Sequence, residues 1–433
     1  MQRWQHAAIF SSLLCGMAFG FLACGSNNQS VRPPVTHRAL ISNYTNSNIT
    51  IADTDHDVLS NVIGSFSNSP GLMELSNDRK FTVAYGPVDN SVTIINNLQQ
   101  AAGGSARLAD PNALPNASVS VTISPDDGTI LGAVPNEVVF GQAPGAVDVV
   151  SAASNGTLTR QPSIPLVSVR YLNPIPNGNR VVAMSDTANN PANPSGPTGR
   201  VWIITPSLIG TGTQPYTEVK SALFDHPVFA IGSADNTTAY VLNCGPECGG
   251  AQAGIVTIDL TTDTVVGTAA LAVPGGSTVA LLNANMLYVA GTVPGSPAKG
   301  FVTPVDLVTS TLSPAIPIAN GYHDRIAQGA DNLLFVGARG CDIVGTMQGC
   351  LTMIGNPNST SPKVTIAPPV QFVFPAPNPG DDVTGIAPIP NRHIVYVIQG
   401  GELLIYDTTT ATLEVLTNPL DIVGQAVDVV VLD

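Results

Sequence analysis

Short runs of alternating apolar and polar residues, rich in Val, Ile, Tyr and Thr, follow one another along most of the chain. One series contains Tyr240–Asn243, then Ile255–Asp259 after a loop with Cys and Gly, then Asp263–Gly267. A period of two residues is typical of β-strands, and the Asp-Leu-Thr-Thr between the second and third runs is typical of a turn. No sustained apolar stripe of helical period follows the N-terminal segment. The pattern therefore predicts an all-β domain.

The runs form a repeated unit of four strands, which we name A, B, C and D in chain order. B, C and D recur eight times. The first unit, residues 39–63, has no A strand, and the chain ends in Gln425–Leu432, an A strand with no B after it. Such a period predicts a single β-propeller of eight four-stranded blades. Seven blades is the alternative, since a long insertion can imitate a blade. We expect the C-terminal strand to pair with the N-terminal blade and close the ring.

The N-terminus is predicted to be a targeting segment. Arg3 and His6 precede an unbroken run of apolar or small residues that extends to Ala23. The run ends in Phe-Leu-Ala-Cys24-Gly25, which resembles the lipobox of bacterial lipoproteins and implies that Cys24 is lipidated. An ordinary secretory signal cut nearby is the alternative. Either interpretation predicts an exported protein.

This interpretation divides the chain into a signal peptide (1–23), a lipidated Cys with a flexible tether (24–37) and a propeller domain (38–433). The expected location is the cell membrane, reached through the lipid anchor, on the outer-membrane or periplasmic side. By analogy with sorting in diderm bacteria, Gly25 in place of Asp favours the outer membrane.

The charge of the chain limits its possible partners, and its cysteines predict disulfide bonds. The net charge is −14 and only 11% of residues are charged, which argues against nucleic acid or anionic lipid as a partner. Four cysteines remain in the predicted domain, and an even number in an exported chain predicts disulfides. We expect local pairs, Cys244 with Cys248 and Cys341 with Cys350, although four cysteines allow three pairings. A zinc site at these spacings is the alternative.

Several segments carry a family resemblance. Residues 70–81, Ser-Pro-Asp-Asp-Gly at 124–128, residues 238–243 and Tyr-Asp-Thr-Thr-Thr at 406–410 resemble YVTN-type propeller repeats, which are similar to NHL and WD40-like rings. The resemblance covers nearly all of the predicted domain. It implies the fold and hardly any activity, because such rings are mostly binding scaffolds and in some relatives enzymes. The chain departs from the family in its irregular third and seventh units and in its eight repeats where seven are usual.

Polar residues near the starts of A strands are the candidate site, because A strands border the central channel of a propeller. Residues from several blades would converge there on a polar funnel for a ligand or a cation. The alternative is that polar residues line the water-filled channel of any propeller. The candidates are Asp225, His226, His323, Asp324, Arg325, Asp381 and Asp382.

Two further carboxylate patterns have simpler interpretations. Asp residues recur at the ends of C strands before Thr-rich segments, as at Asp259, Asp306 and Asp407, and are expected to cap turns. Residues 53–57 resemble the start of a calcium loop, but Val58 and Gly64 stand where an EF-hand needs Gly and Glu. A structural or axial calcium ion stays open, and otherwise no cofactor is expected.

No nucleophile elbow, dinucleotide fingerprint, P-loop or zinc-protease motif is present, so no catalytic residue is assigned. We expect a membrane-anchored binding or interaction module at the bacterial cell envelope. Its partner, an envelope protein or a small ligand, is expected on the face that carries the B–C and D–A loops. The alternatives are a lactonase-like hydrolase with a cation in the channel and a structural subunit of an envelope complex.

Overall fold

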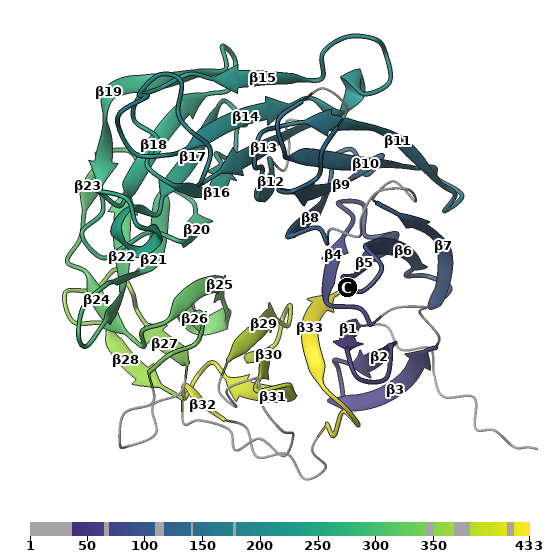
Figure 1. The fold of residues 1–433 in the computed structure, drawn as a ribbon. Coiled ribbons are helices and arrows are strands. Elements are labelled where there is room, and N and C mark those ends of the chain that lie inside the picture. Colours follow the sequence, from purple (N-terminus) through teal and green to yellow (C-terminus); the bar gives the residue numbers. More distant parts are fainter. Residues whose placement is uncertain are drawn as a thin grey trace, which may run out of the picture. The chain divides into compact units, whose positions relative to one another are not determined.

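Eight antiparallel sheets surround a central channel, as the repeat count predicts (Figure 1). The computed structural model describes residues 37–64, 69–108, 117–139, 142–175, 179–342, 350–367, 382–413 and 420–433. All of them belong to one unit, residues 37–433. The predicted signal peptide and Cys24 lie outside the described residues. Each sheet is one blade of a β-propeller, and its strands succeed one another outwards from the channel.

The first four blades have four strands each, named in order from the channel outwards. Blade 1 contains β33 (Ala426–Val431), β1 (Arg38–Asn43), β2 (Asn48–Asp53) and β3 (Val58–Ile63). Blade 2 contains β4 (Leu72–Leu75), β5 (Phe81–Gly86), β6 (Ser91–Asn96) and β7 (Ala101–Arg107). Blade 3 contains β8 (Ser120–Ile123), β9 (Thr129–Val134), β10 (Ala146–Ala152) and β11 (Leu158–Pro165). Blade 4 contains β12 (Tyr171–Ile175), β13 (Arg180–Ser185), β14 (Arg200–Ile204) and β15 (Tyr216–Val219).

The other four blades follow the same plan. Blade 5 contains β16 (Pro227–Gly232), β17 (Thr238–Asn243), β18 (Gly254–Asp259) and β19 (Thr264–Ala272). Blade 6 contains β20 (Val279–Asn283), β21 (Met286–Val293), β22 (Lys299–Asp306) and, both on β22, β23 (Thr311–Leu312) and β24 (Ile316–Ile318). Blade 7 contains β25 (Tyr322–Gln328), β26 (Leu333–Arg339), β27 (Leu351–Gly355) and β28 (Lys363–Ile366). Blade 8 contains β29 (Val383–Pro388), β30 (Ile394–Gln399), β31 (Glu402–Asp407) and β32 (Thr412–Leu413). Short 3₁₀ helices lie at Pro206–Leu208 (η1), Gly245–Cys248 (η2) and Ala330–Asn332 (η3).

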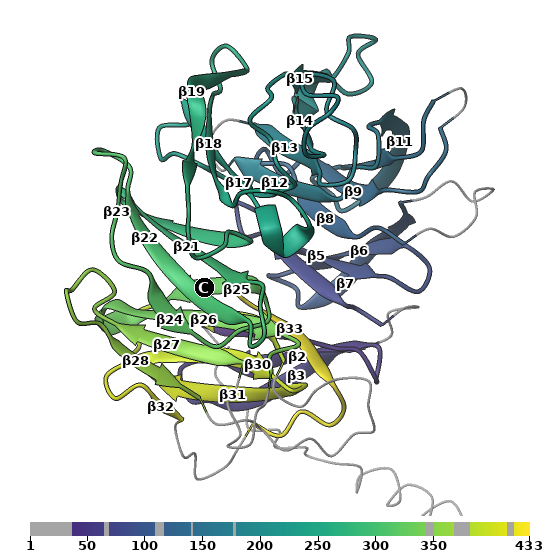
Figure 2. The same cartoon turned by 60° about the vertical axis from the view of Figure 1, so that its left-hand side comes forward.

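The C-terminal strand closes the ring, which confirms the predicted closure. β33 pairs antiparallel with β1, with Ile41 opposite Val429. Both views show the yellow β33 beside the purple strands of blade 1 (Figures 1 and 2). Arg38 Nε lies 2.9 Å from Asp433 Oδ2 and ties the last residue to the start of β1. Pairing the chain ends leaves no open sheet edge where they meet.

The hydrophobic core lies between the faces of neighbouring blades. One cluster joins blade 8 to blade 1 through Tyr396, Ile398, Ala39 and Val429, which are all buried. Every residue of the second strand of blade 3, β9, is buried, whereas the outermost strand of blade 2, β7, is mostly exposed. Burial of a Val or Ile side chain contributes about 1.5–3 kcal/mol, so the packed inner strands hold the ring together.

The meander gives the ring two different faces. A–B and C–D turns lie on one of them, which we call the turn face. B–C and D–A connections lie on the other, which we call the loop face. This topology follows from the strand order of every sheet. Both predicted disulfides, Cys244–Cys248 and Cys341–Cys350, are present in B–C connections of the loop face.

Long polar stretches of the sequence predict D–A connections at 98–116, 207–226 and 361–380, and each of these three segments contains a strand. The third contains β28, and its residues 368–380 lie outside the described residues. The segment 98–116, expected to be a D–A connection, contains the outer strand β7. The segment 207–226 contains β15, and the loop before β15 is a C–D connection of the turn face. Exposed outer strands are difficult to recognise in the sequence. They bury little surface, so their residues are mostly polar and show little of the alternation that predicts a strand. The B–C segments 186–199 and 244–254 are long, as expected.

Two inner strands also begin elsewhere than the pattern suggests. The sequence pattern predicts A strands that begin near Leu166 and Arg325, but residues 166–170 form a turn and β12 of blade 4 begins at Tyr171. β25 begins at Tyr322 rather than Arg325, because a register irregularity between His323 and Arg325 interrupts the alternation that marks a strand.

The described residues include no helix long and apolar enough to span a bilayer.

Candidate binding site at the mouth of the central channel

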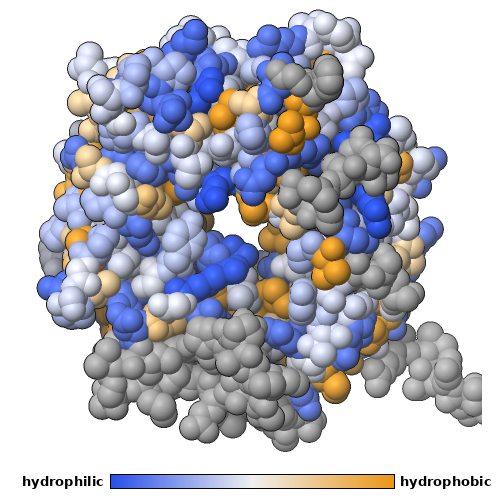
Figure 3. Space-filling model, viewed as in Figure 1, coloured by the Kyte–Doolittle hydropathy of each residue, from blue (hydrophilic) through white to orange (hydrophobic). Residues whose placement is uncertain are grey.

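A cavity of about 470 Å³ opens where the inner strands begin, at the loop-face end of the channel. We call it the channel mouth. It is bordered by residues of several blades, among them Leu72, Val121, Tyr171, Tyr322, Arg325 and Arg339. The space-filling view shows an opening at the centre of the ring, with hydrophilic and hydrophobic residues both at its rim (Figure 3). Apolar walls with a few convergent polar groups are typical of small-molecule sites.

Arginine and aspartate side chains of blade 7 form the charged part of the channel mouth. Arg339 Nε lies 2.8 Å from Asp324 Oδ2, and Arg325 Nη1 lies 3.6 Å from the same oxygen. Arg325 Nε donates to the Thr384 carbonyl at 2.7 Å, which fixes this guanidinium against blade 8. No hydrogen bond of Nη1 or Nη2 of Arg339 occurs within the described part of the chain, and this side chain is 44% exposed. Arg339 therefore presents donors to the cavity.

Asp382 borders the same group on blade 8. Its Oδ1 accepts the Gly340 N–H at 2.7 Å, just after Arg339. Burial raises the pKa of Asp382; the Gly340 N–H and Arg339 oppose that rise, and Asp324 adds to it. The carboxyl thus anchors the end of β26 and keeps Arg339 at the mouth.

Two tyrosines from distant blades meet across the mouth. The phenols of Tyr171 (blade 4) and Tyr322 (blade 7) both border the cavity and lie close enough for each to affect the pKa of the other. The Tyr171 hydroxyl donates to Asp186 Oδ2 at 3.3 Å. Burial raises the pKa of Tyr322 to about 12 and also raises that of Tyr171, so both phenols stay protonated donors. A ligand in the cavity would meet hydroxyl groups from blades 4 and 7 and guanidinium groups from blade 7.

Polar side chains connect the inner strands further along the channel. Asp428 Oδ2 accepts the Met73 N–H at 2.7 Å and so links blade 1 to blade 2. Glu74 Oε1 accepts the Thr122 hydroxyl at 2.7 Å and links blade 2 to blade 3. Burial raises the pKa of Glu74 to about 7, against the hydrogen bond from Thr122. Burial also raises the pKa of Asp428, although Arg325 lies close enough to oppose this. These two carboxyls of the channel are therefore protonated more readily than exposed ones.

Asp225 and His226 hold loops together beside the mouth. His226 Nδ1 lies 2.8 Å from Asp225 Oδ1, and His226 Nε2 lies 3.0 Å from Thr198 Oγ1. Asp225 Oδ2 accepts two backbone N–H groups of the 244–254 loop, at 2.8 and 2.7 Å. The order carboxylate, imidazole, hydroxyl matches that of a hydrolase triad. However, the Thr198 hydroxyl donates to the Asp186 carbonyl at 2.5 Å. The group therefore bridges two B–C loops and is not a poised nucleophile.

The remaining predicted site residues do not all lie at the channel mouth. His323 is only 1% exposed, its Nε2 bonds to the Ala319 carbonyl at 3.0 Å, and burial lowers its pKa to about 4. It belongs to the packing between blades and does not line the cavity, which corrects its expected place. Asp381 lies outside the described residues. Asp324, Arg325 and Asp382 come together as expected.

Sequence reasoning missed Arg339 and both tyrosines. Arg339 ends β26, opposite Tyr322 in the register. Its position at the loop-face end of a B strand was the available signal, since that end reaches the same face as the start of the neighbouring A strand. Nothing in the sequence relates Tyr171 to Tyr322, because they are 151 residues apart and meet only through closure of the ring.

The described residues contain no group of three or more His, Cys, Asp or Glu side chains placed to hold a metal ion. Within the calcium-like segment, Arg392 donates to both oxygens of Asp57, at 2.8 and 2.7 Å. The Tyr396 hydroxyl also donates to Asp57, at 2.6 Å. A carboxylate so engaged does not fit a calcium ligand, and instead it joins blade 8 to blade 1.

The comparisons with known proteins give the fold. No protein-family model matches the chain, and no curated protein is significantly similar in sequence. Among solved structures, the dihydro-heme d1 dehydrogenase NirN in complex with DHE is similar over 94% of this chain and 78% of its own. The TM-score is 0.62 and the identity 12%. The periplasmic gluconolactonase PpgL of Pseudomonas aeruginosa is similar over 91% and 98%, with a TM-score of 0.50 and 13% identity. The chain is thus an eight-bladed β-propeller with distant structural relatives of varied function.

Proposed function

We propose that this protein is an exported, membrane-anchored binding protein of the bacterial cell envelope. Its ligand is a small carboxylate-bearing molecule that occupies the channel mouth. The observation that carries the proposal is Arg339, which is held by Asp324 and presents guanidinium donors to the cavity. Guanidinium groups bind carboxylates through paired hydrogen bonds, so the geometry favours an anionic group at this point.

The surroundings of Arg339 support a small ligand. Sixteen Lys and Arg residues occur in the whole sequence, so Arg325 and Arg339 together are a local concentration of positive charge in an acidic chain. Tyr171 and Tyr322 add hydroxyl groups, and Leu72 and Val121 add apolar surface. A cavity of about 470 Å³ suits a molecule of metabolite size.

The relatives and the cysteines support the setting. NirN was solved in complex with DHE, and PpgL is a periplasmic gluconolactonase, so rings of this fold interact with small molecules. Two disulfides are typical of proteins that fold outside the cytosol. The lipobox-like segment around Cys24 supports an anchor, and residues 25–37 would serve as its tether.

Binding is tested with a panel of mono-, di- and tricarboxylates, each paired with its neutral amide, by thermal shift and calorimetry on the full-length protein. We expect the carboxylates to bind and the amides to bind at least tenfold more weakly. Arg339→Gln should abolish the preference, since a charge-assisted hydrogen bond contributes about 1.5–3 kcal/mol. Lys80→Gln removes one positive charge on the turn face and serves as the control. Equal binding of acids and amides, or unchanged binding to Arg339→Gln, contradicts the proposal.

Anchoring is tested separately by metabolic labelling with an alkyne-tagged fatty acid. The protein should be labelled and should sediment with membranes, whereas Cys24→Ala should lose both properties. Cys15→Ala, in the same segment, is the matched control and should behave like the unmodified sequence. Labelling that survives Cys24→Ala contradicts the assignment.

A further inference from the structure

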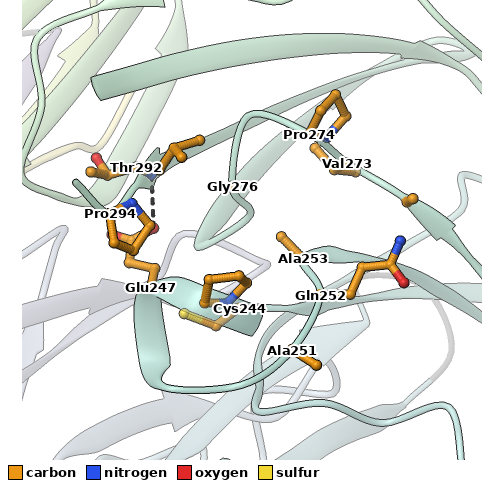
Figure 4. Close-up of a pocket in the computed structure, with 13 residues that line it drawn as sticks. Cys244, Glu247, Ala251, Gln252, Ala253, Val273, Pro274, Gly276, Thr292 and Pro294 are labelled. Atoms are coloured by element: carbon orange, nitrogen blue, oxygen red, sulfur yellow. Dashed lines mark hydrogen bonds between the residues drawn. The ribbon is translucent and has the colours of Figure 1, made fainter. Parts of the chain in front are cut away.

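A second cavity, of about 270 Å³, lies on the loop face between blades 5 and 6. Loops from three places form its walls: the B–C loop of blade 5, the connection from β19 to β20, and the B–C loop that follows β21. Its surface is mainly apolar, from Ala253, Val273, Pro274 and Pro294, and a single carboxyl, Glu247, stands at one side (Figure 4). We call it the Glu247 pocket.

The walls are fixed in place before any ligand binds. The Cys244–Cys248 disulfide closes the turn that carries Glu247, and Asp225 accepts the Ala251 N–H at 2.8 Å on the opposite wall. A Cβ on Gly276 would lie 2.7 Å from the Thr292 nitrogen. Only Gly fits there, and its close approach to β21 sets the depth of the pocket. A preformed cavity needs little ordering when it binds a ligand.

Glu247 is oriented by one hydrogen bond and has one oxygen left over. Its Oε2 accepts the Thr292 N–H at 2.8 Å, as the dashed line in Figure 4 shows. No hydrogen bond to Oε1 occurs within the described residues. Burial raises the pKa of Glu247 to about 7, against the bond from Thr292. A carboxyl held in apolar surroundings gains most from a partner that supplies a positive charge.

Few other charges face this carboxyl. Among the described residues that line the pocket, no other is ionisable. Tyr322 of β25 lies close enough for Glu247 to raise the pKa of its phenol. The Asp225 carboxylate and the His226 carbonyl accept backbone N–H groups of the same B–C loop. An ammonium group in the pocket would therefore have Glu247 as its counter-ion.

We propose that the Glu247 pocket binds a small molecule with a primary ammonium group and an apolar body, the ammonium group on Glu247 and the body against Val273 and Pro274. This site is distinct from the channel mouth and goes beyond the function proposed above, because its chemistry selects amines where the mouth selects carboxylates. Its volume suits a body about the size of one aromatic ring.

The test uses 2-phenylethylamine, with 2-phenylethanol and 3-phenylpropionate as neutral and anionic comparators, on the full-length protein by calorimetry and ligand-observed NMR. We expect saturable binding of the amine at pH 8 and at least tenfold weaker binding of both comparators. Amine affinity should fall about tenfold at pH 6, because the ligand must displace a proton from a carboxyl whose pKa is about 7.

Variants test whether the amine binds in the Glu247 pocket and not elsewhere on the surface. Glu247→Gln should lower amine affinity at least tenfold and remove its pH dependence, and Ala251→Trp should block the pocket from its exposed rim. Glu402→Gln is the matched control, because burial also raises the pKa of that loop-face carboxyl, and it should bind the amine normally. Arg339→Gln should also bind it normally, which distinguishes this result from failure of the channel mouth. Absence of amine binding to the unmodified protein, equal binding of the comparators, or unchanged affinity in Glu247→Gln overturns the proposal.

Discussion

The two faces of the ring treat carboxylates in opposite ways. On the turn face, Asp259 Oδ1 accepts the Thr261 hydroxyl and N–H at 2.6 and 2.7 Å, and Asp407 makes the same bonds with Thr409. These local hydrogen bonds lower the pKa of both groups, as the expected turn caps should. On the loop face and along the channel, burial raises the pKa of Glu247, Asp382 and Asp428.

This contrast distinguishes two kinds of carboxyl group in the same ring, those that cap turns and those that are buried on the loop face or along the channel. A carboxylate that accepts hydrogen bonds from its own turn recurs from blade to blade. The carboxyls of Glu247, Asp382 and Asp428 instead accept N–H groups of other blades, and burial raises their pKa. Glu247 and Asp382, whose pKa values are raised, lie at the two sites for which ligands are proposed above. Substitutions on each face can break or sharpen the contrast.

Both faces exist only in a closed ring, so loss of closure has the largest expected effect. Deletion of residues 424–433 removes β33, the bond from Met73 to Asp428, and the packing of Ala426 and Val429. We expect cooperative unfolding to disappear or its midpoint to fall far below that of the full chain, as followed by circular dichroism. Asp433→Ala removes only the contact with Arg38 and should melt nearly normally. A truncated chain that melts like the full chain would show that closure does not hold the ring.

Asp148 tests the buried carboxyls directly. Its side chain is fully buried, and burial raises its pKa to about 7, with Ser163 opposing and Glu137 adding to the rise. Because the folded pKa exceeds that of the unfolded chain, its favourable contribution is complete below about pH 4 and is lost as pH rises through 7. Asp148→Asn should leave stability at pH 4 nearly unchanged and raise the free energy of unfolding at pH 8 by roughly 2–4 kcal/mol. Urea titrations across this range measure it, and an unchanged pH profile would contradict the assignment.

Asp225 tests whether the loop face depends on contacts between loops. Asp225→Ala would leave two backbone N–H groups of the 244–254 loop and the His226 ring without their acceptor. A buried donor left unsatisfied costs about 1–3 kcal/mol, and these N–H groups are only partly buried, so we expect a loss of roughly 1–2 kcal/mol in urea unfolding. Hydrogen exchange should rise first in the 244–254 loop. A uniform rise in hydrogen exchange over the whole ring would mean that the contacts of Asp225 stabilise the whole fold and not this loop alone.

The smallest effect is expected on the turn face. Asp259, Asp306 and Asp407 have lowered pKa values, so their contribution is present above the unfolded pKa and is lost as pH falls through the folded value. The triple Asp→Asn variant should therefore lose this small contribution at pH 7, approach the stability of the unmodified protein at strongly acidic pH, and show a flatter loss of stability below about pH 4. Thermal melts from neutral to strongly acidic pH measure both the stability at pH 7 and its loss at acidic pH. A strong effect at neutral pH would show that these turns do more than cap.

The sequence by itself determined whatever repeats or is local. Eight strand patterns specified the blades, and an A strand without a B after it specified the closure that β33 makes with β1. Close spacing favoured the two local disulfides over the other pairings, because loop closure between nearby cysteines costs little, and the structure contains both. Turn caps such as Asp259 were also readable, since a residue two positions on completes them.

Only the tertiary structure decided which side chains meet in the channel. A register irregularity turned His323 into the packing between blades and left Asp324 and Arg325 at the mouth. Tyr171 and Tyr322 became neighbours only when the ring closed, and Arg339 joined them from the end of a B strand. The physical reason is range: strand period and turn chemistry act over a few residues, whereas the site depends on the cross-ring distances fixed by packing all the blades together.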